Sequence, residues 1–191
     1  GRRPGVALEV HVLETPKVVA QALPGGLVVV SRGLVELARS DEHALAFILG
    51  HEAAHLLRDH HGLLGSLGVL GAGSTTGRAP PSAEQVRAYQ AMELEADRLG
   101  ALFSALAGYQ ASSAIRVLLT LTARTGPDLF HPNPQERASA IRERLAEITE
   151  HLEVFHLGLF LTGVGRYLEA ARVLEHFLAL FPSREVLSAV G

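Results

Sequence analysis

The sequence has no cysteine, no tryptophan, one methionine and one lysine among its 191 residues. The absence of cysteine excludes disulfides, thiolate zinc sites, iron–sulfur clusters and a cysteine nucleophile. The single lysine, Lys17, leaves almost no candidate for Schiff-base or P-loop chemistry. Ten histidines are present, and any metal site would have to use histidine and carboxylate ligands.

The sequence also lacks a large charge excess and a long apolar run. A net charge of −3 excludes a strongly basic nucleic-acid-binding surface, so no nucleic-acid partner is expected. No stretch reaches about 18 apolar residues, and we expect no transmembrane segment. The chain starts Gly1-Arg2-Arg3-Pro4 with neither methionine nor an apolar signal core. We therefore expect a mature or trimmed fragment whose targeting signal is not visible.

Strand patterns occur only in the N-terminal part. Residues 6–13 alternate as a strand, and a Pro-Gly-Gly turn at 24–26 joins residues 20–23 to the β-branched run Leu27–Val30 in a hairpin. The rest predicts helices: from the cap at Ser40-Asp41-Glu42 to about His60, from the Ser82 and Gln85 capping box to about Gly108, and over roughly 111–124, 135–150 and the tail from 151. We predict an α+β fold, predominantly α, with a small antiparallel sheet.

The segment His51-Glu52-Ala53-Ala54-His55 has the spacing H-E-x-x-H. On a helix, residues i and i+4 share a face, so both imidazoles can hold one zinc ion while Glu52 lies beside that face. A chance match to so short a pattern is the alternative. The helix before the motif is apolar, so its polar groups enter a half-buried setting, where a metal would satisfy all three together.

A catalytic zinc ion needs a third protein ligand. Glu93 and Asp97 share a helix face between apolar neighbours, where one carboxylate can bind a cation and the other can accept a ligand histidine's N–H. The alternative is a charged surface stripe. His61 has the spacing of the third metzincin histidine, but that pattern needs glycine where this chain has Arg58, and we reject it.

Two polar residues near these motifs, His60 and Glu95, are not expected to bind the metal. His60 lies five residues past His55, about 140° around a continuing helix, so we expect it to be structural rather than a ligand. Glu95 points away from the face shared by Glu93 and Asp97, and we expect it to be solvated.

Several motifs together resemble the zinc metallopeptidases of the HtpX and CAAX-prenyl-protease superfamily, and most closely its soluble bacterial BepA-like branch, which carries tetratricopeptide repeats. The motifs, spread over residues 6 to about 145, are Pro24-Gly25-Gly26, Ser31-Arg32-Gly33-Leu34, Asp41-Glu42, His51–His55 with His60, and Glu93-Leu94-Glu95-Ala96-Asp97. The resemblance implies a zincin-like metallopeptidase domain over residues 1–150. It also implies one Zn²⁺ bound by His51, His55 and Glu93. Glu52 would be the catalytic acid/base, and Asp97 would be the partner of a ligand histidine.

The segment from His131 to Arg137 resembles the H-P-x-x-x-x-R segment of the same superfamily. We expect His131 to point into the active site, either as a zinc ligand in a latent state or as a donor to the oxyanion. A loop on the polar surface is the alternative. Arg137 can pair with a site carboxylate such as Asp97, and solvent exposure is its alternative.

Residues 151–191 form the second predicted domain. Residues 157–182, with Gly165-Arg166-Tyr167 at a turn, resemble one tetratricopeptide repeat, and a generic helical hairpin is the alternative. One repeat cannot bury its own apolar face. We therefore expect it to pack on the first domain or to continue in further repeats, and Ser183–Gly191 resembles the start of a next helix.

These features predict a zinc-dependent endopeptidase that acts on protein or peptide substrates, and the resemblance implies a role in protein quality control. The resemblance favours the bacterial periplasm or cell envelope, with the cytoplasm as the alternative. We expect an extended substrate to add to the strand at Leu27–Val30, under a glycine-rich loop over residues 62–81. One rival is a scaffold or chaperone that binds a partner through the repeat-like helices and has a latent or vestigial zinc site. The other is a zinc hydrolase acting on a small-molecule amide.

Overall fold

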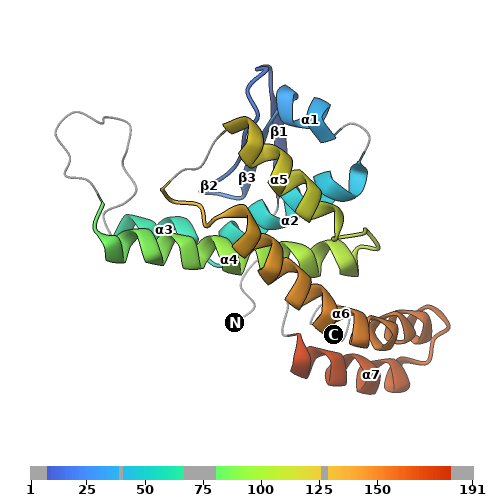
Figure 1. The fold of residues 1–191 in the computed structure, drawn as a ribbon. Helices are drawn as coiled ribbons and strands as arrows, with labels where there is room; N and C mark the ends of the chain where they lie inside the picture. The colour runs from blue at the N-terminus through green and yellow to red at the C-terminus, as the bar shows by residue number, and fades with distance from the viewer. Residues whose placement is uncertain (1–7, 39–40, 67–80, 126–128, 182–191) are drawn as a thin grey trace. The chain divides into compact units, whose positions relative to one another are not determined.

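The computed structural model describes residues 8–38, 41–66, 81–125 and 129–181. The chain divides into two compact units, residues 1–144 and 145–191. Helices dominate, as predicted, and the first three elements of the chain form a small sheet (Figure 1). The elements are β1 (Glu9–Leu13), β2 (Ala20–Leu23), β3 (Leu27–Ser31), α1 (Arg32–Ala38), α2 (Glu42–Leu57), α3 (His60–Ser66), α4 (Ala83–Leu106), α5 (Ser113–Thr125), α6 (Pro134–Gly163) and α7 (Tyr167–Leu180).

The sheet has the strand order β1-β3-β2. The predicted hairpin is confirmed: β2 and β3 are antiparallel, with Ala22 opposite Val28. The prediction of a purely antiparallel sheet is wrong, because β1 pairs with β3 in parallel. Alternation of side chains predicts a strand but carries no information about its direction. The link from β1 to β2 is fixed to the end of β3 by hydrogen bonds such as that from Ser31 N–H to the Val19 carbonyl, 2.9 Å.

The central position of β3 in the sheet shows that the expected addition of a substrate strand to Leu27–Val30 is wrong. Strand β3 is hydrogen-bonded on both sides, so a peptide cannot add to Leu27–Val30. Strand β2 is an edge strand and packs against α2. The Ala22 N–H donates to Glu52 on α2 rather than to β3. The sheet edge beside the H-E-x-x-H helix is therefore β2.

Helix α2 carries the H-E-x-x-H motif and starts where the sequence predicts. The Asp41 side chain caps it by accepting a hydrogen bond from Ala44 N–H, 3.0 Å. The helix ends at Leu57 rather than near His60, because Asp59 has a left-handed backbone conformation with φ 53°. Such a residue ends an α-helix, and α3 begins at His60. Most of the predicted 62–81 loop, residues 67–80, lies outside the described residues.

Helix α4 runs alongside α2 (Figure 1), and its predicted start is confirmed by the capping box between Ser82 and Gln85. The two helices approach closely where Gly50 faces Gly100. A Cβ atom on Gly100 would lie only 2.9 Å from the backbone nitrogen of His51. The two glycines therefore let α4 lie directly against the first turn of the H-E-x-x-H motif.

Helix α6 is continuous from Pro134 to Gly163, so the expected end near residue 150 is wrong. No glycine or proline occurs between Pro134 and Gly158 to interrupt it. Within the second unit, α6 and α7 pack as a helical hairpin, with the rings of Phe155 and Phe177 5.2 Å apart. The expected helix at 183–191 lies outside the described residues. No helix in the described part of the chain is long and apolar enough to cross a membrane.

Candidate metal centre

Three buried side chains from α2 and α4 converge on one point. His51, His55 and Glu93 each offer a ligand atom, and these atoms all lie within 4.8 Å of one another. The two Nε2 atoms are 3.1 Å apart, and each lies 3.4 Å from a Glu93 carboxylate oxygen. Ligand atoms about 2.0–2.1 Å from a tetrahedral zinc ion are about 3.3 Å apart. The three side chains therefore have the spacing of zinc ligands.

The unsatisfied polar atoms of the cluster also fit a cation. Among the described residues, Glu93 Oε2 is buried and accepts no hydrogen bond. A buried carboxylate oxygen without a partner is costly. Two imidazole nitrogens and one carboxylate oxygen, with no sulfur, form a donor set that zinc accepts readily. Zn²⁺ thus fits these three residues.

The outer nitrogen of His51 faces a buried ion pair. Its Nδ1 lies 3.0 Å from Oδ1 of Asp97, which is fully buried. Arg137 donates two hydrogen bonds to the Asp97 carboxylate, 2.7 Å from Nε and 2.6 Å from an Nη atom. This contact orients the ring so that its Nε2 atom faces the cluster. Metal-binding histidines are commonly oriented by a carboxylate at their other ring nitrogen.

The electrostatics of the site favour ionised carboxylates. Burial alone would lower the pKa of His51, but the neighbouring carboxylates of Asp97 and Glu93 outweigh burial and raise the pKa to about 10. Burial and the charge of His51 lower the pKa of His55 to about 3. Burial opposes ionisation of Glu93 and Asp97. The nearby His51, and for Asp97 also the hydrogen bonds from Arg137, nevertheless keep the pKa of both carboxylates below its ordinary value. Glu93 therefore offers one negative charge to a cation, and His51 loses its extra proton when its Nε2 atom binds a metal.

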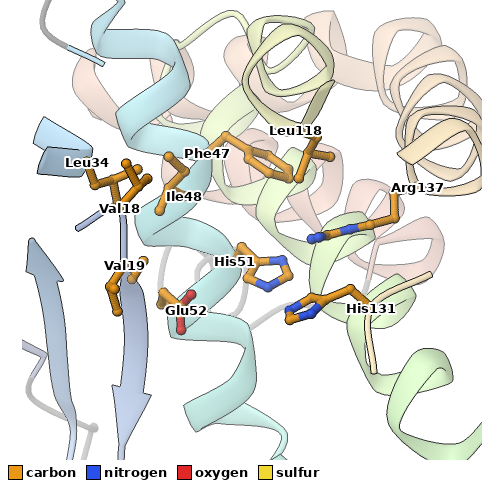
Figure 2. Close-up of a pocket in the computed structure, with 11 residues that line it drawn as sticks. Val18, Val19, Leu34, Phe47, Ile48, His51, Glu52, Leu118, His131 and Arg137 are labelled. Atoms are coloured by element: carbon orange, nitrogen blue, oxygen red, sulfur yellow. The ribbon is translucent and has the colours of Figure 1, made fainter. Parts of the chain in front are cut away.

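Glu52 lies beside the cluster on the wall of a cleft (Figure 2). Its Oε2 accepts a hydrogen bond from Ala22 N–H of β2, 2.7 Å. Burial raises the pKa of Glu52, which makes its carboxylate a better proton acceptor. The cleft has a volume of about 140 Å³. Its lining is polar at one end and apolar at the other, and includes His51, Glu52, His131, Arg137, Val18, Leu34, Phe47, Ile48 and Leu118.

His131 lies at the polar end of this cleft, where Figure 2 shows it beside His51. Its Nε2 is 3.5 Å from Glu93 Oε2, and its side chain is 45% exposed. It stands outside the group of three residues whose atoms converge. The structure thus brings His131 to the site but not into the ligand cluster, whereas Arg137 is buried beside Asp97.

The Nδ1 atom of His55, which points away from the cluster, contacts His60. The sequence did not predict this contact. His60 Nδ1 is 3.0 Å from His55 Nδ1, and His60 Nε2 is 3.4 Å from Glu95 Oε2. The expected direction of the His60 side chain is wrong because α2 ends before His60. Glu95 is 43% exposed, as its expected solvation implies, but it also contacts His60 and Arg58. The signal in the sequence was Asp59, since aspartate tolerates the left-handed conformation better than most residues.

Comparison with known proteins finds similarity to metallopeptidases over part of the chain. Residues 3–76 match the model of Peptidase family M48. A stretch of 51 residues is 43% identical to the mitochondrial metalloendopeptidase OMA1 of Bos taurus. That alignment covers 27% of this chain and only 10% of the relative. Both matches support a zinc metallopeptidase superfamily.

The family match contains part of the candidate centre. His51, Glu52, His55 and His60 lie within residues 3–76, whereas Glu93, Asp97 and Arg137 follow that segment. The structure brings Glu93 and Asp97 to the first group by packing α4 against α2, and Arg137 of α6 donates hydrogen bonds to Asp97. The similarity therefore covers the H-E-x-x-H helix, and the fold supplies the third candidate ligand.

Proposed function

We propose that this chain is a zinc-dependent endopeptidase that hydrolyses peptide bonds of protein substrates. The observation that carries the proposal is the cluster of His51, His55 and Glu93 with Glu52 beside it on a cleft wall. The match to Peptidase family M48 supports this assignment. The whole protein's substrates and partners are part of the proposal, since the alignment covers a tenth of the curated relative.

The chain's own residues suit metal-assisted hydrolysis. Zinc, when bound by His51, His55 and Glu93, supplies a Lewis acid that activates water and polarises a carbonyl group. Glu52 accepts the proton of the attacking water and then donates it to the leaving amine. Asp97 holds His51 in the tautomer whose Nε2 is free to bind the metal.

The cleft favours an extended peptide with an apolar side chain near the scissile bond. Strand β2 presents an edge beside Glu52, and edge strands bind peptides through main-chain hydrogen bonds. The apolar part of the lining, which includes Phe47, Ile48 and Leu118, suits one aliphatic or aromatic side chain. We extend the proposal to quality control of unfolded proteins, with partners bound through α6 and α7, on the strength of the family resemblance.

The direct test is cleavage of an unfolded protein such as casein. We expect cleavage by the zinc-loaded chain, loss of cleavage after zinc is removed with a chelator, and recovery when zinc is returned. A chain that binds zinc but cleaves neither casein nor a peptide library contradicts the peptidase proposal and favours a scaffold. Cleavage of small amides alone favours the other rival, a zinc hydrolase of small molecules.

His131 is proposed to donate a hydrogen bond to the oxyanion that forms during hydrolysis. Its place in the cleft, outside the ligand cluster, supports this role. Removing one such donor costs about 10²–10³-fold in kcat. We expect His131→Ala to lower kcat by about 10²-fold and to leave zinc affinity unchanged. A rise in kcat would instead support the latent state in which His131 binds zinc.

A further inference from the structure

A series of polar contacts leads from the buried His55 and His60 outward to the exposed Arg58. The Nδ1 atoms of His55 and His60 are 3.0 Å apart, and the Nε2 atom of His60 is 3.4 Å from Oε2 of Glu95. Glu95 Oε1 in turn lies 2.8 Å from Nε of Arg58. His60 is only 1% exposed, and both of its ring nitrogens face a polar partner.

The positions of the hydrogens along the contacts from His55 through His60 to Glu95 follow from which of these groups can donate and which can only accept. Glu95, paired with Arg58, can only accept, so the His60 Nε2 atom carries a hydrogen and donates it. The Nδ1 atom of a neutral His60 then has a lone pair. His55 donates its Nδ1–H to that lone pair. The Nε2 atom of His55 is left without a hydrogen, and it is this atom that lies 3.4 Å from Glu93.

We infer that His60, held by Glu95, is a positioning residue that fixes the ring orientation and tautomer of the zinc ligand His55. The inference rests on the proposed zinc site. The same arrangement is present at the other histidine, where His51 Nδ1 faces Asp97 and its Nε2 faces the cluster. Outer partners of this kind orient metal-binding histidines and raise their basicity.

The backbone supports this role. Had α2 continued, the side chain of His60 would have turned away from His55. The left-handed residue Asp59 ends the helix and returns His60 to the ligand. Helix α4 then supplies three carboxylates at alternate positions: Glu93 to the cluster, Glu95 to His60 and Asp97 to His51.

The test measures zinc affinity, by competition with a chromophoric chelator, and the absorption spectrum of the cobalt-loaded chain. We expect His60→Ala to weaken zinc binding roughly 10- to 100-fold and to change the cobalt spectrum. His60→Asn should recover most of the affinity, because its Oδ1 can accept the His55 hydrogen in place of Nδ1. His176→Ala, at an exposed position on α7, is the control, and we expect it to bind zinc within about twofold of the parent chain.

Two results would overturn the inference. One is a folded His60→Ala chain that binds zinc as tightly as the parent. The other is His60→Asn binding as weakly as His60→Ala. If His60→Ala does not fold, Glu95→Ala is tested instead, because the Glu95 side chain is 43% exposed and should tolerate truncation. Unchanged zinc affinity in Glu95→Ala would then overturn the inference. A parent chain that binds no zinc would overturn the proposed function itself.

Discussion

Glu52→Gln is expected to abolish peptide cleavage while leaving zinc bound. Glutamine has nearly the shape of glutamate and can still accept the hydrogen bond from Ala22 N–H, so the cleft wall should keep its structure. It cannot take a proton from water or return one to the leaving amine. General acid–base catalysis contributes about 10²–10⁴-fold, and we expect kcat to fall by at least that factor. Peptide cleavage and zinc content are measured on the same preparation.

The control for this variant is Glu84→Gln, at an exposed position in the first turn of α4. It removes the same charge far from the cleft and should leave both readouts unchanged. Cleavage by Glu52→Gln at more than a tenth of the parental rate would contradict the role of Glu52. Loss of zinc along with activity would show that Glu52 supports the metal site rather than the proton transfer.

Arg137→Ala is expected to lower the free energy of unfolding by about 3–5 kcal/mol, because it leaves one partner of a buried ion pair without its counter-charge. The Asp97 side chain is 0% exposed and Arg137 is 11% exposed, so water from the cleft replaces the guanidinium only incompletely. Burial of an unpaired carboxylate also disturbs His51, which faces Asp97 at 3.0 Å. We therefore expect weaker zinc binding as well. Urea unfolding measures the first effect, and chelator competition the second.

Arg142→Ala provides the comparison, because Arg142 is exposed on the same helix. Its substitution should change the free energy of unfolding by less than about 0.5 kcal/mol. If Arg137→Ala were no more destabilising than Arg142→Ala, the pair with Asp97 would have to be open to water. Such a result would remove the reason for expecting an effect on His51.

The sequence predicted the elements of the fold better than their directions. Turn and cap residues act locally, so the hairpin at Gly25-Gly26, the cap at Asp41 and the capping box at Ser82 could be identified from neighbours in the chain. The parallel pairing of β1 with β3 is a non-local choice that alternation does not encode. The end of α2 depended on the conformation of a single residue, Asp59.

The same distinction applies to the candidate site. Helical periodicity was enough to place His51 beside His55 and Glu93 beside Asp97, since each pair is separated by four residues. It could not show that α4 would bring Glu93 to the two histidines. That contact depends on the close approach of Gly50 and Gly100. Glu95 and His60 were missed because an unbroken helix would have turned His60 away from His55.

Metal analysis of the purified chain, combined with zinc X-ray absorption, tests the central claim that His51, His55 and Glu93 bind one zinc ion. We expect one zinc ion per chain, with two imidazole nitrogens at about 2.0–2.1 Å and at least one carboxylate oxygen in its first coordination sphere. We also expect Glu93→Ala to lose most of the bound zinc. A parent chain without zinc, a zinc ion lacking two imidazole ligands, or full zinc occupancy in Glu93→Ala would contradict the claim.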